Sequence, residues 1–162
     1  TPKPSSAASD VYKRQPSSLG MGANLFYAAF ETGEFKDYLR ALGKLFTMKS
    51  EAELDAITAF SGSGPALIFE YARLFEKHLT AIAGSNPEAR EIITQTFLGS
   101  AKLMESAISQ GVNFETLREQ VTSKKGVTFE ALQILEKNNL ENIMGGAFTA
   151  AYKRTLEIKK GI

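Results

Sequence analysis

The chain contains 162 residues, 43% of them hydrophobic and 23% charged, and its 19 basic and 18 acidic side chains leave a formal net charge of +1. That length allows one domain with a hydrophobic core and part of a second, and the balanced charge excludes the strong positive field that gathers nucleic acid or an anionic membrane. Cysteine is absent and His78 is the single histidine, which excludes disulfides and cysteine nucleophiles and argues against a metal site. Because no apolar run could cross a bilayer and no secretory signal is present, we expect a cytoplasmic protein.

The N-terminal third is predicted to contain only part of a domain. Residues 1–15 are polar, include two prolines and follow neither a strand nor a helix period, so we expect a disordered or non-native leader. Residues 16–49 predict a short β-α-β unit, with a buried strand within 19–30, a helix over 34–45 and a strand over 46–49. Such a unit is typical of the edge of a larger α/β domain.

From Ser50 onward the apolar spacing is helical, and residues 50–162 are predicted to form one helical domain. Ser50 and Glu53 have the spacing of a capping box, which satisfies two backbone amides at a helix start. Later helices are predicted from Pro65 to Gly84, from Asn86-Pro87 to Gly111, from Asn113 to Val121, over 127–137 and over 140–159. The fold class is therefore mainly α, a helical bundle preceded by the β-α-β unit.

Two of these helices carry small or apolar residues on more than one face. They are the helix that contains Gly99-Ser-Ala101 and the alanine-rich helix over 140–159. A helix that is apolar on several sides has to bury each of them, so a second subunit is expected to complete part of the core. The sequence therefore predicts a homodimer.

Two segments rich in small residues are predicted to be loops that open helices. One is Ser61-Gly-Ser-Gly-Pro-Ala66, and the other is Thr122–Thr128, which contains Lys124 and Lys125. The first backbone amides of a helix have no partner within it, so a helix start flanked by Ser, Thr and Gly attracts phosphate or carboxylate. Each segment also has a simpler interpretation: an ordinary turn for the first, and a solvated basic loop for the second.

Other polar residues are interpreted as structural. His78 is expected at the surface of a helix, and Glu51, Glu53 and Asp55 most simply supply negative charge at a helix N-terminus. Gly20–Leu25 begins like a dinucleotide-binding fingerprint but lacks its third glycine. No pair of carboxylates is suited to acid–base work, and no Ser-His-Asp arrangement can be built with the single histidine.

Four segments together resemble pyrroline-5-carboxylate reductase, which makes proline by reducing a cyclic imine with NADPH or NADH. They are Asp55–Ala66, Leu117–Ser123 with the glycine loop that leads to Thr128, Ala131–Glu136 and Ala150–Glu157. The resemblance implies a Rossmann domain that binds the cofactor, of which residues 16–49 are the last edge. It also implies a helical C-terminal domain of the 6-phosphogluconate-dehydrogenase-like type that forms a homodimer, with higher oligomers of dimers left open, and binds a small carboxylate substrate.

The resemblance further implies roles for particular residues. The substrate carboxylate is bound through hydroxyls and backbone amides of Ser123, Gly126, Val127 and Thr128. A wall near the imine and the nicotinamide is formed by Ser61, Gly62, Ser63, Gly64 and Pro65. The NADP or NAD cofactor is held mainly by the N-terminal domain that this chain lacks, so the chain orients the substrate and is expected to be inactive alone.

The chain departs from the pattern of that family at three places. Lys124-Lys125 stands where the family has Pro-Gly, Leu67 stands where it has Tyr, and its Met-Pro-Asn-Thr-Pro stretch has no clear copy around Pro16–Ser18. Loss of glycine restricts the backbone and loss of proline loosens the turn, so the carboxylate geometry is affected. Two alternatives stay open: a related imine or hydroxyacid reductase, and a non-catalytic dimerisation module.

Overall fold

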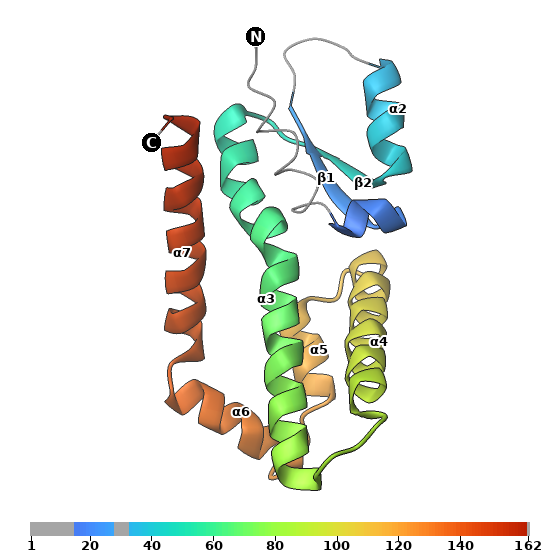
Figure 1. Ribbon diagram of the computed structural model, residues 1–162, viewed down its shortest axis with the longest axis vertical. Helices are drawn as coiled ribbons and strands as arrows, with labels where there is room; N and C mark the ends of the chain where they lie inside the picture. The colour runs from blue at the N-terminus through green and yellow to red at the C-terminus, as the bar shows by residue number, and fades with distance from the viewer. Residues whose placement is uncertain (1–14, 28–32, 162) are drawn as a thin grey trace. The chain divides into compact units, whose positions relative to one another are not determined.

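The computed structural model describes residues 15–27 and 33–161 (Figure 1). Its elements are η1 (Gln15–Leu19), β1 (Gly22–Phe26), α2 (Gly33–Ala41), β2 (Gly43–Thr47), α3 (Glu51–Ala83), α4 (Ala89–Ser109), α5 (Phe114–Gln120), α6 (Val127–Lys137) and α7 (Leu140–Lys159). The fold class predicted from the sequence, mainly helical with a short β-α-β unit, is confirmed. All of the predicted leader except Gln15 lies outside the described residues.

The chain divides into two compact units, which we describe separately. The first unit runs up to Ile68 and resumes at Gly145, and the second comprises Phe69–Met144. Helices α3 and α7 each contribute residues to both units. The sequence predicts a boundary between residues 49 and 50, which would separate the edge of a Rossmann domain from the helical domain. This boundary stays a prediction.

In the first unit, β1 and β2 form a parallel pair in which Gly22 lies opposite Gly43. A Cβ on Gly43 would lie 2.1 Å from the carbonyl oxygen of Gly22, and the φ of Gly43 is +141°, so only glycine fits there. This close approach starts β2 at Gly43, and the predicted helix over 34–45 therefore ends earlier, at Ala41. The predicted strand over 46–49 was placed too late for the same reason.

Helix α2 packs against one face of this sheet. Burial alternates along β1, and Gly22, Asn24 and Phe26 are buried on the same face. The Phe26 ring lies 6.1 Å from that of Phe35 on α2, and Leu39 on the same helix is buried. The buried strand predicted within 19–30 is confirmed for Gly22–Phe26, while its residues 28–30 lie outside the described part of the chain.

Helix α3 corrects the most prominent expectation from the sequence. Ser61-Gly-Ser-Gly-Pro65 was expected to be a loop that opens a helix at Pro65, but α3 is one continuous helix of 33 residues and contains Pro65. Proline within a helix removes a single backbone hydrogen bond, here the one to the carbonyl of Ser61. The helical residues on both sides outweigh that loss, so this segment does not present the unpaired amides of a helix start.

Within the first unit, the N-terminal part of α3 is held to the C-terminal part of α7. The rings of Phe60 and Phe148 stack with centroids 4.4 Å apart. The amino group of Lys159 lies 2.6 Å from Asp55 and 2.9 Å from Glu51. These contacts join segments about a hundred residues apart in sequence.

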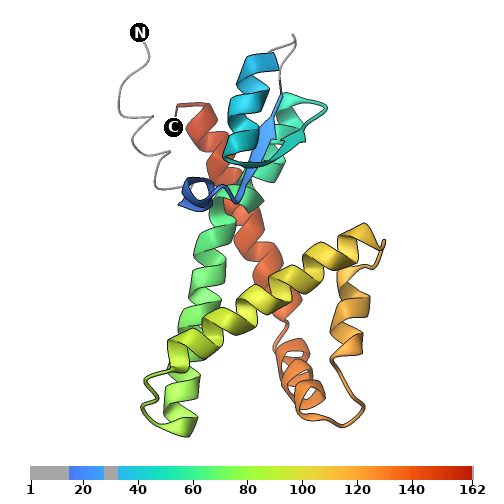
Figure 2. The same ribbon diagram turned by 90° about the vertical axis from the view of Figure 1, so that its right-hand side faces the viewer.

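In the second unit, α4 follows the C-terminal part of α3 and leads into α5 and α6 (Figure 2). The rings of Phe75 and Phe97 meet edge to face at 5.5 Å, and Arg90 forms an ion pair with Glu76. Helix α4 begins at Ala89 rather than at Pro87. The Asn86 side chain does not cap the helix itself but accepts a hydrogen bond from the Glu88 amide in the preceding turn.

The remaining helix predictions were accurate. Asn113 caps α5 by accepting a 2.8 Å hydrogen bond from the amide of Thr116, as predicted, and α5 ends at Gln120, one residue before the predicted end. Both 127–137 and 140–159 are helices with the predicted bounds. Ser50 also receives the expected hydrogen bond from the Glu53 amide, and the Glu53 side chain in return accepts from the amide of Lys49.

The hydrophobic core of the described chain is small. Its buried apolar side chains are Phe26, Leu39, Ala59, Ala89, Ile93 and Ala107. Large apolar residues on every long helix are instead exposed, including Ile92, Leu103 and Ile108 on α4. No helix in the described ranges has the length and apolar character needed to cross a membrane.

Candidate functional site

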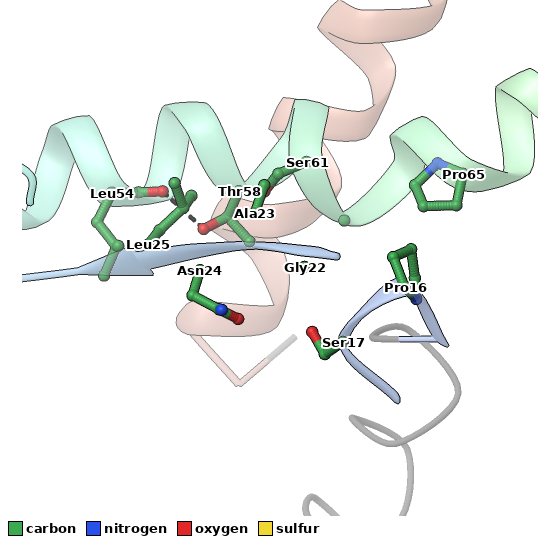
Figure 3. Close-up of a pocket in the computed structure, with 11 residues that line it drawn as sticks. Pro16, Ser17, Gly22, Ala23, Asn24, Leu25, Leu54, Thr58, Ser61 and Pro65 are labelled. Atoms are coloured by element: carbon green, nitrogen blue, oxygen red, sulfur yellow. Dashed lines mark hydrogen bonds between the residues drawn. The ribbon is translucent and has the colours of Figure 1, made fainter. Parts of the chain in front are cut away.

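A cavity of about 210 Å³ lies within the first unit (Figure 3). It is lined by Pro16, Ser17, Gly22, Ala23, Asn24, Leu25, Leu54, Thr58, Ser61, Gly62 and Pro65. None of these lining residues carries a charge. Of the five residues predicted to form a wall near the imine and the nicotinamide, Ser61, Gly62 and Pro65 line this cavity, while Ser63 and Gly64 do not.

One wall of the cavity is a single face of α3. Thr58 follows Leu54 by four residues, Ser61 and Gly62 follow Thr58 by three and four, and Pro65 follows these two by four and three, which places all five on one side of the helix. The Thr58 hydroxyl donates a 2.7 Å hydrogen bond to the carbonyl of Leu54. Sequence reasoning missed Leu54 and Thr58, because it treated Ser61–Pro65 as a loop; a helical interpretation would have placed them on the same face.

The opposite wall comes from η1 and β1. The segment Gly20–Leu25, interpreted from the sequence as structural, places four of its residues along the cavity. Gly20 has a φ of +68°, and its amide donates to the carbonyl of Ser17 at 3.1 Å. This glycine turn brings η1 back against the start of β1, which positions Ser17 beside Gly22.

The second predicted group of site residues lies in the second unit, at the N-terminus of α6. Gly126 is the N-cap residue, with φ −85° and ψ 175°, and no side chain caps the helix start. Its amide donates to the carbonyl of Ser123 at 3.0 Å, and Ser123, Val127 and Thr128 are exposed. The first amides of α6 are therefore free of helix partners and open to solvent, which is the chemistry predicted for carboxylate binding.

The backbone around Gly126 is tightly constrained. A Cβ on Gly126 would lie 2.2 Å from the Ser123 hydroxyl oxygen. Lys125 has a φ of +58°, in the left-handed region that glycine favours and other residues occupy at a cost of about 1 kcal/mol. Lys124 and Lys125 are both exposed. The loop thus keeps a glycine-like conformation at Lys125, where the resembled family has glycine.

Charged groups elsewhere in the first unit are structural. Hydrogen bonds to Asp55 and then to Glu51, opposed by desolvation, raise the pKa of Lys159 above its ordinary value. Two of the three carboxylates expected to supply charge at a helix start, Glu51 and Asp55, thus also hold α7. Among residues 15–27 and 33–161, no group of three or more potential ligands is placed to bind a metal ion.

Comparison with known proteins shows that the curated relatives of this chain are oxidoreductases. The chain is 35% identical to the pyrroline-5-carboxylate reductase of Pasteurella multocida over 125 residues, which are 77% of this chain and 45% of that protein. It is 30% identical to the enzyme of Vibrio alginolyticus over 155 residues, 93% of this chain and 56% of that protein. Residues 51–158 match the family model described as pyrroline-5-carboxylate reductase dimerisation. The chain belongs to the pyrroline-5-carboxylate reductase family.

Solved structures agree with this assignment. A pyrroline-5-carboxylate reductase from Coxiella burnetii superimposes with a TM-score of 0.77 at 31% identity, covering 88% of this chain and 54% of that one. The fold is also shared with the Plasmodium falciparum enzyme, solved with NADP bound, at a TM-score of 0.71 and 22% identity over 86% of this chain and 57% of that one. The chain spans about half the length of the relatives it matches.

Proposed function

We propose that this chain is the substrate and dimerisation half of a pyrroline-5-carboxylate reductase, which reduces the C=N bond of 1-pyrroline-5-carboxylate to proline with NADPH or NADH. The family match over 51–158 carries this proposal. The open N-terminus of α6 supports it, because a carboxylate is the group such a helix start attracts. The chain spans only about half the length of its relatives, so we expect it to lack reductase activity alone. We also expect the protein to be cytoplasmic.

Two groups of residues are assigned roles in this reaction. Ser123, Gly126, Val127 and Thr128 bind the substrate carboxylate through hydroxyls and backbone amides. Ser61–Pro65 provide a wall near the imine and the nicotinamide, and the lining of the first-unit cavity by Ser61, Gly62 and Pro65 supports this role. Hydride comes from the cofactor, so these residues act by orientation and charge.

The functional form is a homodimer, and the exposed apolar residues of α4 support it. Ile92, Thr96, Gly99 and Leu103 recur at intervals of four, three and four residues, which places them on one stripe of the helix. Leu103 is 59% exposed, and a Cβ on Gly99 would meet no atom within 4 Å in the single chain. A second copy would remove this stripe from water. Assembly of dimers into higher oligomers stays a prediction.

A second candidate function is a dimerisation module without catalysis. Lys124 and Lys125 favour it, because they replace the Pro-Gly pair of the resembled family next to the carboxylate-binding amides. Replacement of Lys124 by Pro together with Lys125 by Gly separates the two functions. A gain of ligand affinity in the double variant indicates that the carboxylate site persists.

The test is calorimetric titration of the chain with proline and with a carboxylate-bearing five-membered ring analogue, with light scattering to establish the dimer. Binding that is lost in Thr128→Ala supports the reductase half-site. Thr116→Ala is the matched control, since Thr116 lies in the first turn of α5 rather than of α6. A dimer that binds neither compound contradicts the assignment of Ser123–Thr128 and leaves the dimerisation module.

A further inference from the structure

The thioether of Met144, in the first turns of α7, accepts a hydrogen bond from a tyrosine. The hydroxyl oxygen of Tyr71 on α3 lies 3.2 Å from Met144 Sδ, although the two residues are 73 positions apart. Both residues lie in the second unit, and both are half-buried. A thioether sulfur is only a weak acceptor, so this hydrogen bond orients the two side chains more than it stabilises the unit.

The sulfur of a methionine can be oxidised, and this chain contains four methionines and no cysteine. With hydrogen peroxide, a lone pair of the sulfur attacks one peroxide oxygen, the O–O bond breaks and an S–O bond forms. The departing hydroxide takes the proton of the transferred oxygen and leaves as water, so sulfur is oxidised and peroxide is reduced by two electrons. The sulfoxide has two epimers, because oxygen can be added at either of the two lone pairs of the sulfur.

The Tyr71 hydroxyl distinguishes the two lone pairs of Met144. One lone pair accepts the phenolic hydrogen, and with the Tyr71 oxygen at 3.2 Å there is no space for a peroxide molecule on that side. The other lone pair meets no hydrogen-bond donor from a described residue. Glu141 and Ala147, each three residues away along α7, are exposed, so solvent reaches the helix beside this sulfur.

We propose that Met144 is a site of reversible oxidation at which a single sulfoxide epimer forms, because Tyr71 blocks one lone pair of the sulfur. The new oxygen points away from Tyr71, and the sulfur, which now carries a partial positive charge, becomes a poorer acceptor. The Tyr71 hydroxyl therefore loses its partner, and the contact between α3 and α7 in the second unit weakens. The inference is independent of the proposed function, since neither residue is among those assigned to substrate or cofactor.

The test exposes the folded chain to hydrogen peroxide, removes the peroxide with catalase and follows two tryptic peptides by mass spectrometry. Met144 lies in the peptide 138–153 and Met104 in the peptide 103–118, so each is the single methionine of a peptide of the same length. The oxidised peptides are then treated separately with the two classes of methionine sulfoxide reductase, each of which reduces one epimer.

The two peptides are expected to respond differently. One class of reductase should reduce the oxidised Met144 peptide, and the other class should leave it unchanged. Met104 is 39% exposed, and its sulfur has no hydrogen bond with a described residue, so each class should reduce part of the Met104 peptide. Met104 thus serves as the internal control for the peroxide and for both reductases.

Tyr71→Phe is the informative variant, because it removes the hydroxyl and keeps the ring. Both lone pairs of Met144 are then open, so the Met144 peptide should contain both epimers and should be oxidised faster. Tyr152→Phe is the matched control: Tyr152 is a half-buried tyrosine of α7 whose hydroxyl bonds no described residue, so the single epimer at Met144 should persist. Circular dichroism establishes that both variants are folded.

The weakened contact has its own readout. In a chain that carries Met21→Leu, Met48→Leu and Met104→Leu, Met144 is the one remaining methionine. Oxidation of this chain should lower its melting temperature, and the reductase class that accepts the epimer should restore it. An unchanged melting temperature would contradict the loss of the Tyr71 hydrogen bond.

Three other results would overturn the inference. They are both epimers at Met144 in the original chain, a single epimer retained in Tyr71→Phe, and a Met144 that stays unoxidised while Met104 is converted. Retention of the single epimer in Tyr71→Phe would assign the selectivity to burial of the sulfur rather than to the hydroxyl. None of these results bears on the binding of proline at α6, so the proposed function is tested separately.

Discussion

The amino group of Lys159, near the end of α7, lies 2.6 Å from the carboxylate of Asp55 in the first turns of α3, although 104 residues separate them. The same amino group lies 2.9 Å from Glu51. Lys159 thus joins two helices that are also held together by the Phe60–Phe148 stack. The pair is partly exposed, so its contribution is screened by salt.

The first prediction concerns pH. The pKa of Lys159 is raised in the folded chain, chiefly by the hydrogen bond to Asp55, so folding is favoured by the protonated amine. This stabilisation is complete below the unfolded pKa of lysine, about 10.4, and is lost as pH rises through the higher folded value. Lys159→Gln should therefore lower the melting temperature at neutral pH, and the difference from the original chain should shrink above about pH 10. Exposed Lys153 on the same helix provides the control Lys153→Gln, for which a smaller change of the melting temperature at neutral pH is expected.

The second prediction concerns the left-handed backbone of Lys125. Lys125→Gly should stabilise the chain by about 1 kcal/mol, because glycine adopts a φ of +58° without steric cost. Lys124 is not among the residues with positive φ, so Lys124→Gly should be neutral or destabilising through the greater entropy of the unfolded chain. Urea unfolding of both variants measures the difference. Equal effects at the two positions would count against the backbone explanation.

The third prediction concerns the apolar stripe of α4. Leu103→Glu places a charge at the centre of a surface that a second copy is proposed to cover, and should convert the dimer to a monomer with little change in helical content. Ala101→Glu is the control, since residue 101 lies on nearly the opposite side of α4 and is exposed. Sedimentation velocity and circular dichroism measure the two properties. A Leu103→Glu variant that remains dimeric would mean that another surface joins the copies.

The fourth prediction concerns Pro65. Pro65→Ala restores the amide that α3 lacks at this position and should stabilise the chain by about 1–3 kcal/mol. Pro87→Ala, in the turn before α4, should instead be slightly destabilising. Thermal unfolding of the two variants measures both effects, and a Pro65→Ala variant that is less stable than the original chain would contradict the prediction.

Sequence reasoning was most accurate where a local cap decides the structure. Asn113 fixes the start of α5 through its side chain and Gly126 that of α6 through its backbone, so these starts could be predicted from local sequence. Sequence reasoning failed where residues far apart in the chain determine where an element begins. The start of β2 at Gly43 depends on Gly22, twenty-one positions earlier, and no periodicity within either segment reports that contact.

The candidate site was only partly predictable for a related reason. Glycine and proline are strong local signals for a turn, but in Ser61–Pro65 they lie within a long helix whose flanking residues hold it together. The motif was therefore recognised and its conformation was not. Thr58 and Leu54 became visible only with the helix, and Asn24 only with its partner on α2, because each owes its place in the cavity to packing between elements.

The apposition of Gly22 and Gly43 has a consequence for how this sequence can vary. A Cβ at Gly43 would collide with the Gly22 backbone, and one at Gly22 would lie 2.9 Å from the backbone carbonyl of Leu42, so neither position can accept a larger residue while the strands keep their spacing. Ala23 and Lys44 lie beside them and are exposed. In a library randomised at all four positions and selected for folding, glycine should be recovered at both members of the pair, while the adjacent positions diversify.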